Sequence, residues 1–356
     1  MNSRILNTDI QEFITIHLNS DIAALLLKGT NFPTIETKEI IEQIEAKKRS
    51  EKKLPTWFNA HNIYYPNRLN IEQTSSETTA HYKSSLIAGD SIIDLTGGFG
   101  VDSYYFSKVF KTVYHFEINE LLSEIVKHNY TQLHISTIIT ENSDGIAFLK
   151  TSDKLFDWIY IDPSRRHDSK GKVFFLSDCL PNVPEHLDLL FKHSRNIMIK
   201  TSPLLDVSAG ISELKYVKTI HVVAVNNEVK ELLWILEYGF KGDISIETVN
   251  IKKENSEYFN FSSNSEKTSV SQYSKPLAYL YEPNSAILKA GGFHSITNKH
   301  AIFKLHRHSH LYTSDLLLNF PGRCFKIENI RSYNKKELKN LGMSKANITT
   351  RNFPET

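Results

Sequence analysis

Ser91-Ile-Ile-Asp-Leu-Thr-Gly-Gly-Phe-Gly100 joins an apolar run typical of a β-strand to a glycine-rich turn, and residues 101–109 can start a helix after it. Because glycine lacks a Cβ atom, such a turn can bend sharply and let a ligand lie against the backbone. The free N–H groups at the start of the helix point into the same space. The stretch predicts a nucleotide-type pocket, although a plain strand-to-helix corner can have the same composition.

Strand and helix patterns alternate beyond the turn. The apolar runs lack the polar alternation of a half-exposed strand, which predicts a parallel sheet covered by helices on both faces. The last two runs are separated only by residues 226–231, too short for a helical crossover, so we expect that pair to be antiparallel. The expected strands are residues 91–94, 112–116, 136–140, 157–161, 195–200, 219–225 and 232–238.

Composition describes an ordinary soluble globular protein of 356 residues, with 40% hydrophobic and 23% charged residues. No apolar run approaches a membrane span, and the polar start lacks the pattern of a secretion signal. The two cysteines, Cys179 and Cys324, lie far apart, which argues against disulfides and favours the cytoplasm. The spacing His306-x-His308-x-His310 has no carboxylate or cysteine partner nearby, so we expect one face of an exposed strand and no metal.

Charge is unevenly distributed along the chain. From residue 270 onward, 13 Lys and Arg residues face 5 Asp and Glu residues, a net charge of +8, while the whole chain carries +2. A basic appendage on a body that is net acidic by about six charges suggests an anionic partner, with nucleic acid first. A lysine-rich solvated surface is the simpler alternative.

Acidic residues stand where successive strands of the expected sheet end. Asp94, Glu117 and Asp162 close three strands, and Asp144 follows another. One such acid could simply cap the next helix, but four beside a glycine turn favour a shared pocket. Glu117 lies 23 residues after Asp94, close to the offset at which an acid meets a ribose. A dehydrogenase would use the same acid, but the antiparallel end of the sheet and a rigid Asp-Pro loop argue against one.

From about residue 72 to 240 the chain resembles class I S-adenosylmethionine-dependent methyltransferases. Residues 94–100 look like the glycine-rich first motif of that family. Segments 72–77, 162–166 and 200–203 (Glu-Gln-Thr-Ser-Ser-Glu, Asp-Pro-Ser-Arg-Arg and Lys-Thr-Ser-Pro) look like the bacterial group that carries a C-terminal THUMP-like domain. The resemblance implies a Rossmann-like α/β fold with a seven-stranded sheet whose last strand is antiparallel. It also implies that S-adenosylmethionine is bound by Asp94, Thr96, Gly97, Gly98, Gly100, Glu117, Ser143 and Asp144, with Thr96 at a position where glycine is usual.

By the same resemblance Asp162, Pro163 and Ser164 form the loop that faces the transferred methyl group. Methylation of a pyrimidine carbon needs a cysteine nucleophile, and Ser164 and residues 201–202 stand where such enzymes place it. We therefore expect direct displacement by a base amine held near Asp162. Arg165 or Arg166 is expected to bind a phosphate of the substrate, and the alternative is that it forms a structural salt bridge. Gln73 and Ser75, in the polar loop before a helix, are also expected to contact the substrate.

The expected organisation has a helical region (1–70), a methyltransferase domain (71–245), a linker (246–275), a ferredoxin-like domain (276–320) and a THUMP-like domain (321–356) that we expect to be incomplete. Together these features predict a cytoplasmic enzyme that methylates tRNA or rRNA. Two alternatives stay open: a methyltransferase that acts on a small molecule or a protein, and an inactive RNA-binding protein.

Overall fold

The structure is a computed structural model, and it describes residues 1–165, 175–332, 334 and 345–351. The chain folds into two compact units. The first consists of Met1–Thr201, Ser208–Tyr216 and Ile235–Gly239. The second consists of Ser202–Val207, Val217–Trp234 and Phe240–Thr356.

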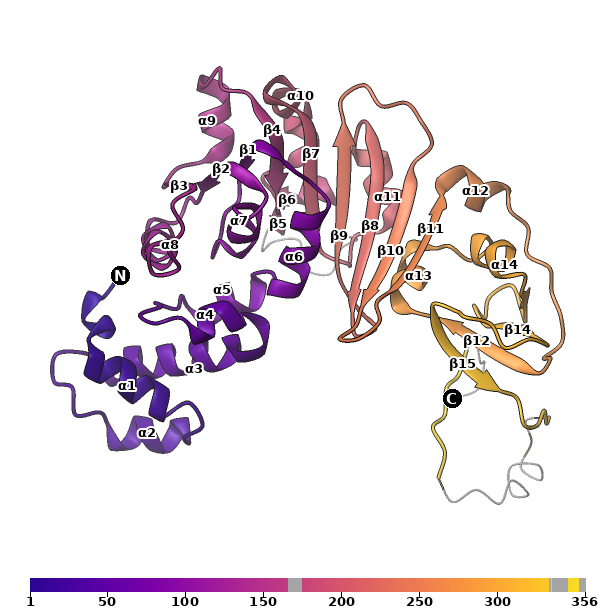
Figure 1. Cartoon of the computed structure of the whole chain (residues 1–356), viewed down its shortest axis with the longest axis horizontal. Coiled ribbons are helices and arrows are strands. Elements are labelled where there is room, and N and C mark those ends of the chain that lie inside the picture. The colour runs from indigo at the N-terminus through magenta and orange to yellow at the C-terminus, as the bar shows by residue number, and fades with distance from the viewer. Residues whose placement is uncertain (166–174, 333, 335–344, 352–356) are drawn as a thin grey trace. The chain divides into compact units, whose positions relative to one another are not determined.

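The first unit opens with helices and then alternates strands and helices (Figure 1). Its described elements are α1 (Thr8–Ile16), α2 (Ile22–Lys28), α3 (Thr37–Lys53), α4 (Pro55–Asn59), α5 (Arg68–Gln73), α6 (Glu77–Ser85), β1 (Gly89–Asp94), α7 (Val101–Phe106), β2 (Phe110–Phe116), α8 (Glu120–Gln132), β3 (Ile138–Glu141), α9 (Gly145–Thr151), β4 (Phe156–Ile161), β5 (Ser164–Arg165), β6 (Cys179–Leu180), α10 (Val183–His193) and β7 (Ser194–Thr201), together with the short 3-10 helices Ser3–Leu6 and Leu176–Asp178.

Parallel pairing brings the carboxyl ends of the strands in this unit to one edge. β1 pairs in parallel with β2 and with β4, so that Asp94 stands beside His115 on one side and Tyr160 on the other. β2 pairs with β3, and β4 pairs with β7. Helices α7, α8 and α10 pack against β2, β3 and β7 respectively. This arrangement places the polar residues after each strand next to one another, as the sequence predicts.

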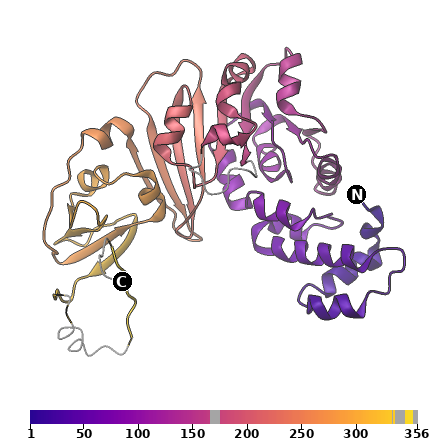
Figure 2. The ribbon, with the colours of Figure 1, turned by 180° about the vertical axis from the view of Figure 1, so that it is seen from behind.

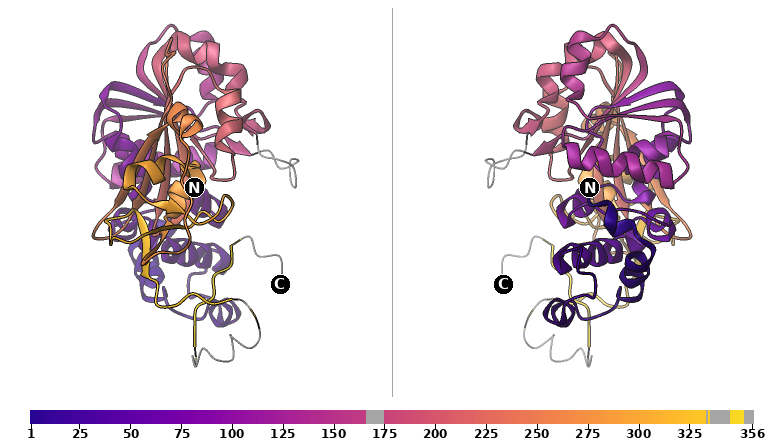
Figure 3. Two further views of the ribbon diagram at one scale, coloured as in Figure 1. Left: turned by 90° about the vertical axis from the view of Figure 1, so that its right-hand side faces the viewer. Right: turned by 90° about the vertical axis from the view of Figure 1, so that its left-hand side faces the viewer.

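The N-terminal helices belong to the same unit. Helix α3 contacts α1, α2, α4 and α5. These helices also lie side by side when the molecule is viewed from behind and from the side (Figures 2 and 3). Trp57 of α4 is fully buried, and its ring centroid lies 6.2 Å from that of Phe99 in the glycine turn. The aromatic contact anchors the turn on the helical region, which helps to fix its position.

The second unit contains the remaining strands of the main sheet and a smaller sheet. Its elements are β8 (Val217–Val225), β10 (Ser245–Ile251), β11 (Glu257–Ser262), α12 (Ser263–Thr268), β12 (Tyr279–Pro283), α13 (Ser285–Ala290), α14 (Ser295–His300), β13 (Phe303–Lys304), β14 (Tyr312–Ser314) and β15 (Gly322–Lys326). The residues of α11 (Val207–Glu213) and β9 (Glu228–Glu237) are divided between the two units.

The predicted fold class is confirmed. The main sheet has the order β11-β10-β8-β9-β7-β4-β1-β2-β3, and its part from β3 to β8 is the expected seven-stranded sheet. Asn226 and Asn227 join β8 to β9 with φ values of 49° and 65°, the backbone of a tight hairpin, so β9 runs antiparallel as predicted.

Residues 246–275 were expected to be a linker, but they contain strands of the main sheet. The domain boundaries themselves stay predictions. β10 pairs in parallel with β8, and β11 pairs antiparallel with β10. The Ser, Asn and Glu content of this segment hides a strand alternation in which Phe259 and Phe261 are buried while Tyr258 and Asn260 are exposed. An edge strand with one solvated face needs only these alternate apolar residues.

The smaller sheet has the order β13-β14-β12-β15, and α13 packs on β8 and β10 within the second unit. β15, which begins the segment expected to be THUMP-like, pairs antiparallel with β12. Its residues therefore complete the small sheet. No helix within the described ranges is long and apolar enough to cross a membrane.

Candidate functional site

Asp94 ends β1 in a buried position, with only 1% of its surface exposed. One carboxylate oxygen accepts a hydrogen bond from the backbone N–H of Thr96 (3.0 Å), and the other accepts one from the Ser103 hydroxyl (2.7 Å). Burial raises the pKa of Asp94 to about 7. Asp94 therefore helps to hold the glycine turn in its conformation through these hydrogen bonds.

The three glycines of the turn serve different purposes. An added Cβ at Gly97 would lie 2.1 Å from the buried His115 ring, and one at Gly100 would lie 2.2 Å from the Tyr130 hydroxyl oxygen. At Gly98, where φ is +54°, the nearest atom would be 3.8 Å away. Gly97 and Gly100 thus permit close packing, whereas Gly98 leaves open space where a ligand could contact the backbone.

Glu117 follows β2 directly and lies beside this open glycine. One carboxylate oxygen accepts the Gly98 N–H (2.9 Å), and the other accepts the Asn119 N–H (2.7 Å). The side chain of Glu117 is half-buried. Its carboxylate is thus held against the turn at a position suited to the hydroxyls of a ribose.

Ser143 and Asp144 lie between β3 and α9, and both are exposed. Asp144 caps α9 by accepting the N–H groups of Ile146 (2.8 Å) and Ala147 (3.3 Å). A Cβ on the next residue, Gly145, would lie 2.7 Å from the Leu95 side chain. The segment therefore lies directly against the start of the glycine turn, but the described contacts of Asp144 are those of a helix cap.

Asp162, after β4, is tied to the glycine turn and to β7. Its backbone N–H donates to the Thr96 hydroxyl (2.7 Å), and its carboxylate forms an ion pair with Lys200. Pro163 is buried and Ser164 is exposed. The backbone of Ser164 and Arg165 forms β5, which pairs with β6, while Arg166 lies outside the described residues.

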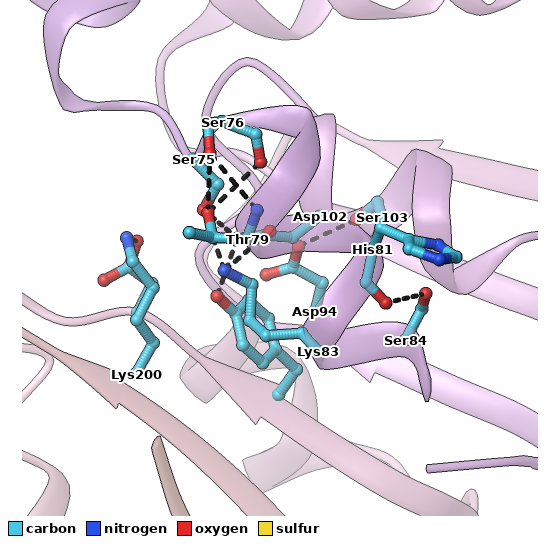
Figure 4. Close-up of polar contacts among 12 residues, drawn as sticks. Ser75, Ser76, Thr79, His81, Lys83, Ser84, Asp94, Asp102, Ser103 and Lys200 are labelled. Atoms are coloured by element: carbon cyan, nitrogen blue, oxygen red, sulfur yellow. Dashed lines mark hydrogen bonds and ion pairs between the residues drawn. The ribbon is translucent and has the colours of Figure 1, made fainter. Parts of the chain in front are cut away.

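The polar loop before α6 reaches the start of α7 through a buried network (Figure 4). Lys83 is fully buried, and its ammonium lies 3.1 Å from an Asp102 oxygen. The hydroxyls of Ser75 (2.8 Å) and Tyr160 (2.7 Å) donate to the other Asp102 oxygen. Ser75 is thus a buried member of this network, whereas Gln73, at the end of α5, is exposed.

Burial by itself would raise the pKa of Asp102, but the charges of Lys83 and Lys200, together with the hydrogen bonds from Tyr160 and Ser75, outweigh it, so the pKa lies below the usual value. Lys83, Asp102 and Lys200 are not among the residues that the sequence patterns predict for the site. A lysine among polar residues gives no signal of burial, and only pairing between distant segments brings these charges together. Lys200 does end an expected strand, which is a signal that could have found it.

Two other candidates carry less weight. No group of three or more His, Cys, Asp or Glu residues could hold a metal ion within the part of the chain that the structure describes, and His306, His308 and His310 lie outside any strand.

A pocket of about 1050 Å³ in the second unit is lined mostly by asparagines and charged residues. Asn250 and Asn284 both donate to Glu257 (3.0 Å each), so these lining groups already serve to join elements of that unit.

Comparisons with known proteins add to this geometry. No curated protein matches the sequence significantly. A family model of a ferredoxin-like domain matches residues 279–321. Among solved structures, an rRNA methylase from Streptococcus thermophilus is 14% identical (45% of this chain, 93% of that chain, TM-score 0.33). TrmK of M. capricolum, in complex with S-adenosyl-homocysteine, is 17% identical (46% and 70%, TM-score 0.36). Similarities at these TM-scores carry no argument about this chain.

A much stronger match is to a crystal structure described as "putative methyltransferase from Porphyromonas gingivalis W83". The two sequences are 31% identical, and the match covers 100% of this chain and 90% of that chain with a TM-score of 0.87. The chain therefore belongs to the methyltransferase family represented by this Porphyromonas gingivalis protein.

Proposed function

We propose that this protein is an S-adenosylmethionine-dependent methyltransferase that acts on tRNA or rRNA, with a base amine as the favoured acceptor. The observation that carries the cofactor assignment is the pair formed by Gly98 and Glu117. Gly98 has open space over its backbone, and the Glu117 carboxylate accepts its N–H at 2.9 Å. An adenosyl group needs such a backbone approach beside an acid that can accept from its ribose.

Thr96, Gly97 and Gly100 would support the same cofactor by shaping the turn, and Asp94 would hold that shape from beneath. Ser143 and Asp144 would lie near the adenine, since their segment packs against the start of the turn. When bound, the cofactor would supply a methyl group activated by its sulfonium sulfur. The acceptor nitrogen would form a bond to the methyl carbon while the carbon–sulfur bond breaks and its electron pair passes to sulfur.

The loop Asp162-Pro163-Ser164 would receive the acceptor. The Asp162 carboxylate is part-exposed, with 32% of its side chain accessible, so it can take a hydrogen bond and then the proton that the amine loses. Alignment of nucleophile and methyl group supplies most of the rate in such a displacement. Few catalytic side chains are therefore needed.

RNA is favoured as the substrate by charge. The region from residue 270 onward carries 13 basic and 5 acidic residues, which suits a phosphate backbone. Arg165 and Arg166 would hold phosphate near the loop, Gln73 would contact the RNA, and Ser75 would position its loop. A THUMP-like function for residues 321–356 and a cytoplasmic location belong to this proposal. A small-molecule or protein substrate, or an inactive RNA-binding protein, is the alternative.

Titration calorimetry with S-adenosylmethionine tests the cofactor assignment. Loss of a charged hydrogen-bond acceptor costs about 1.5–3 kcal/mol, so Glu117→Ala should weaken binding by about 10- to 100-fold. Glu120→Ala is the matched control, because Glu120 is an exposed acid in the first turn of α8. Absence of binding by the wild type, or equal binding by both variants, would refute the assignment.

The substrate is tested by incubating the protein with methyl-labelled cofactor and, separately, with total RNA, protein and small-molecule fractions from a strain that lacks the gene. Label in the RNA fraction is the expected result. Label confined to protein or small molecules would reject RNA while leaving methyl transfer intact.

A further inference from the structure

We propose that Lys200 is a positioning residue for methyl transfer: with Thr96 it clamps Asp162 between the glycine turn and the end of β7. The inference rests on the proposed function, because it assigns Asp162 to the acceptor. It assigns Lys200 a role that the sequence motif alone does not define, and it gives a purpose to the threonine that stands in place of a glycine.

Strand register creates the first half of the clamp. Ile161 of β4 pairs with Ile199 of β7, so the next residues, Asp162 and Lys200, emerge side by side as the two strands end. Their side chains form an ion pair, in which Lys200 is 13% exposed and Asp162 is 32% exposed. A nearly buried ammonium thus holds a carboxylate that still reaches solvent, and it orients the oxygen that it binds.

The second half of the clamp comes from the glycine turn. The Thr96 hydroxyl accepts the backbone N–H of Asp162 at 2.7 Å, and Thr96 is two residues before Gly98. Glycine at position 96 would offer no such acceptor. The same short turn therefore contacts the proposed cofactor through Gly98 and fixes the proposed acceptor loop through Thr96.

Lys200 also acts on Asp102, since its charge helps to lower the pKa of that buried carboxyl. Its positive charge thus acts on two carboxylates from different elements, one of them in the network that holds Ser75. A cation with these two partners can fix the geometry of the acceptor loop.

Lys200→Met tests the clamp, and Lys111→Met is its matched control. Lys111 also pairs with an aspartate of this sheet, Asp90, but at the opposite strand ends and in an exposed position. We expect Lys200→Met to bind S-adenosylmethionine with wild-type affinity by calorimetry and to lose about 100-fold in the single-turnover methylation rate. Its crystal structure should show the Asp162 carboxylate displaced. Lys111→Met should match the wild type in every measurement.

Thr96 supplies an independent pair of variants if Lys200→Met does not fold. Thr96→Val removes the acceptor for the Asp162 N–H and should slow methylation, whereas Thr96→Ser keeps the hydroxyl and should restore the rate.

Rates are measured on whichever fraction, RNA, protein or small molecule, the wild type labels. Label in a fraction other than RNA, with a slow Lys200→Met, would overturn the RNA assignment alone. Wild-type rates in Lys200→Met or Thr96→Val, or an unmoved Asp162, would overturn the clamp alone. A wild type that labels no fraction would overturn both.

Discussion

Gly97 and Gly98 are adjacent in the chain, yet their replacement by alanine should have opposite consequences. At Gly97 the added methyl group meets the interior of the protein, while at Gly98 it enters the open space that we assign to the cofactor. Gly97→Ala should therefore mainly lower the stability of the protein, and Gly98→Ala should mainly lower its affinity for the cofactor.

The cost at Gly97 is steric. Its added Cβ would lie 2.1, 2.4 and 2.5 Å from three atoms of the His115 ring, far inside the contact distance of about 3.5–4.0 Å. His115 is fully buried, and its Nδ1 lies 3.2 Å from the Ser103 hydroxyl, so the ring cannot move freely. Overpacking of this kind costs about 3 kcal/mol or more, a large share of the stability of an ordinary domain.

The cost at Gly98 is conformational. Its φ of +54° is left-handed, and the nearest atom to an added Cβ would be 3.8 Å away, so the loss should be only about 1–2 kcal/mol. Cofactor affinity should fall by at least about tenfold, which corresponds to about 1.4 kcal/mol. Gly239→Ala is the matched control, because Gly239 has a φ of +80° with no atom within 4 Å.

Urea unfolding followed by circular dichroism, and calorimetric titration with S-adenosylmethionine, measure both quantities on the same preparations. Gly97→Ala should unfold at much lower urea than the wild type. Gly98→Ala and Gly239→Ala should unfold alike, and only Gly98→Ala should bind weakly. A Gly97→Ala variant as stable as the wild type, or a Gly98→Ala variant with wild-type affinity, would refute this reasoning.

Two further predictions concern buried charge. Because burial raises the folded-state pKa of Asp94 from 3.8 to about 7, the folded chain binds the extra proton, and wild-type stability should fall by up to about 1.4 kcal/mol per pH unit between these values. Asp94→Asn should remove that contribution in urea unfolding at pH 5, 6 and 7, and an unchanged slope would contradict it. Lys83→Met leaves Asp102 without its closest cation and should cost about 3–5 kcal/mol, partly restored in Lys83→Met/Asp102→Asn. Equal losses in the single and double variants would show that the ion pair is not the cause.

Much of the fold was predictable because the strands of a covered parallel sheet are continuous apolar runs. The short connection between β8 and β9 also predicted an antiparallel pair. Asparagines at its tip adopt the positive φ values that such a tight turn needs. The prediction of a linker over residues 246–275 was wrong for the opposite reason. Its strand β11 buries only alternate residues, and polar side chains on the solvated face outweigh Phe259 and Phe261 in composition.

The candidate site could be predicted as a set of residues at strand ends, but its side-chain contacts could not. Ser76 caps α6, and the Glu77 carboxylate accepts hydrogen bonds from Thr56 (2.6 and 2.7 Å) and Tyr105 (2.8 Å). Local spacing alone could not reveal these partners, because they come from α4 and α7. The buried Lys83 was missed for the same reason, whereas Lys200 ends an expected strand and could have been found from that position.

The four strand-end acids take different positions, and this division sharpens the proposed chemistry. Asp94 is buried under the turn, and Asp144 is exposed but uses one carboxylate oxygen to cap α9. Glu117 and Asp162 keep part-exposed carboxylates, and they are linked to Gly98 and Thr96 respectively. Because those two residues are separated only by Gly97, the proposed cofactor acid and acceptor acid are both tied to one three-residue segment. Packing of Gly97 against His115 fixes that segment, which is why the distance between cofactor and acceptor should depend on a residue that contacts neither.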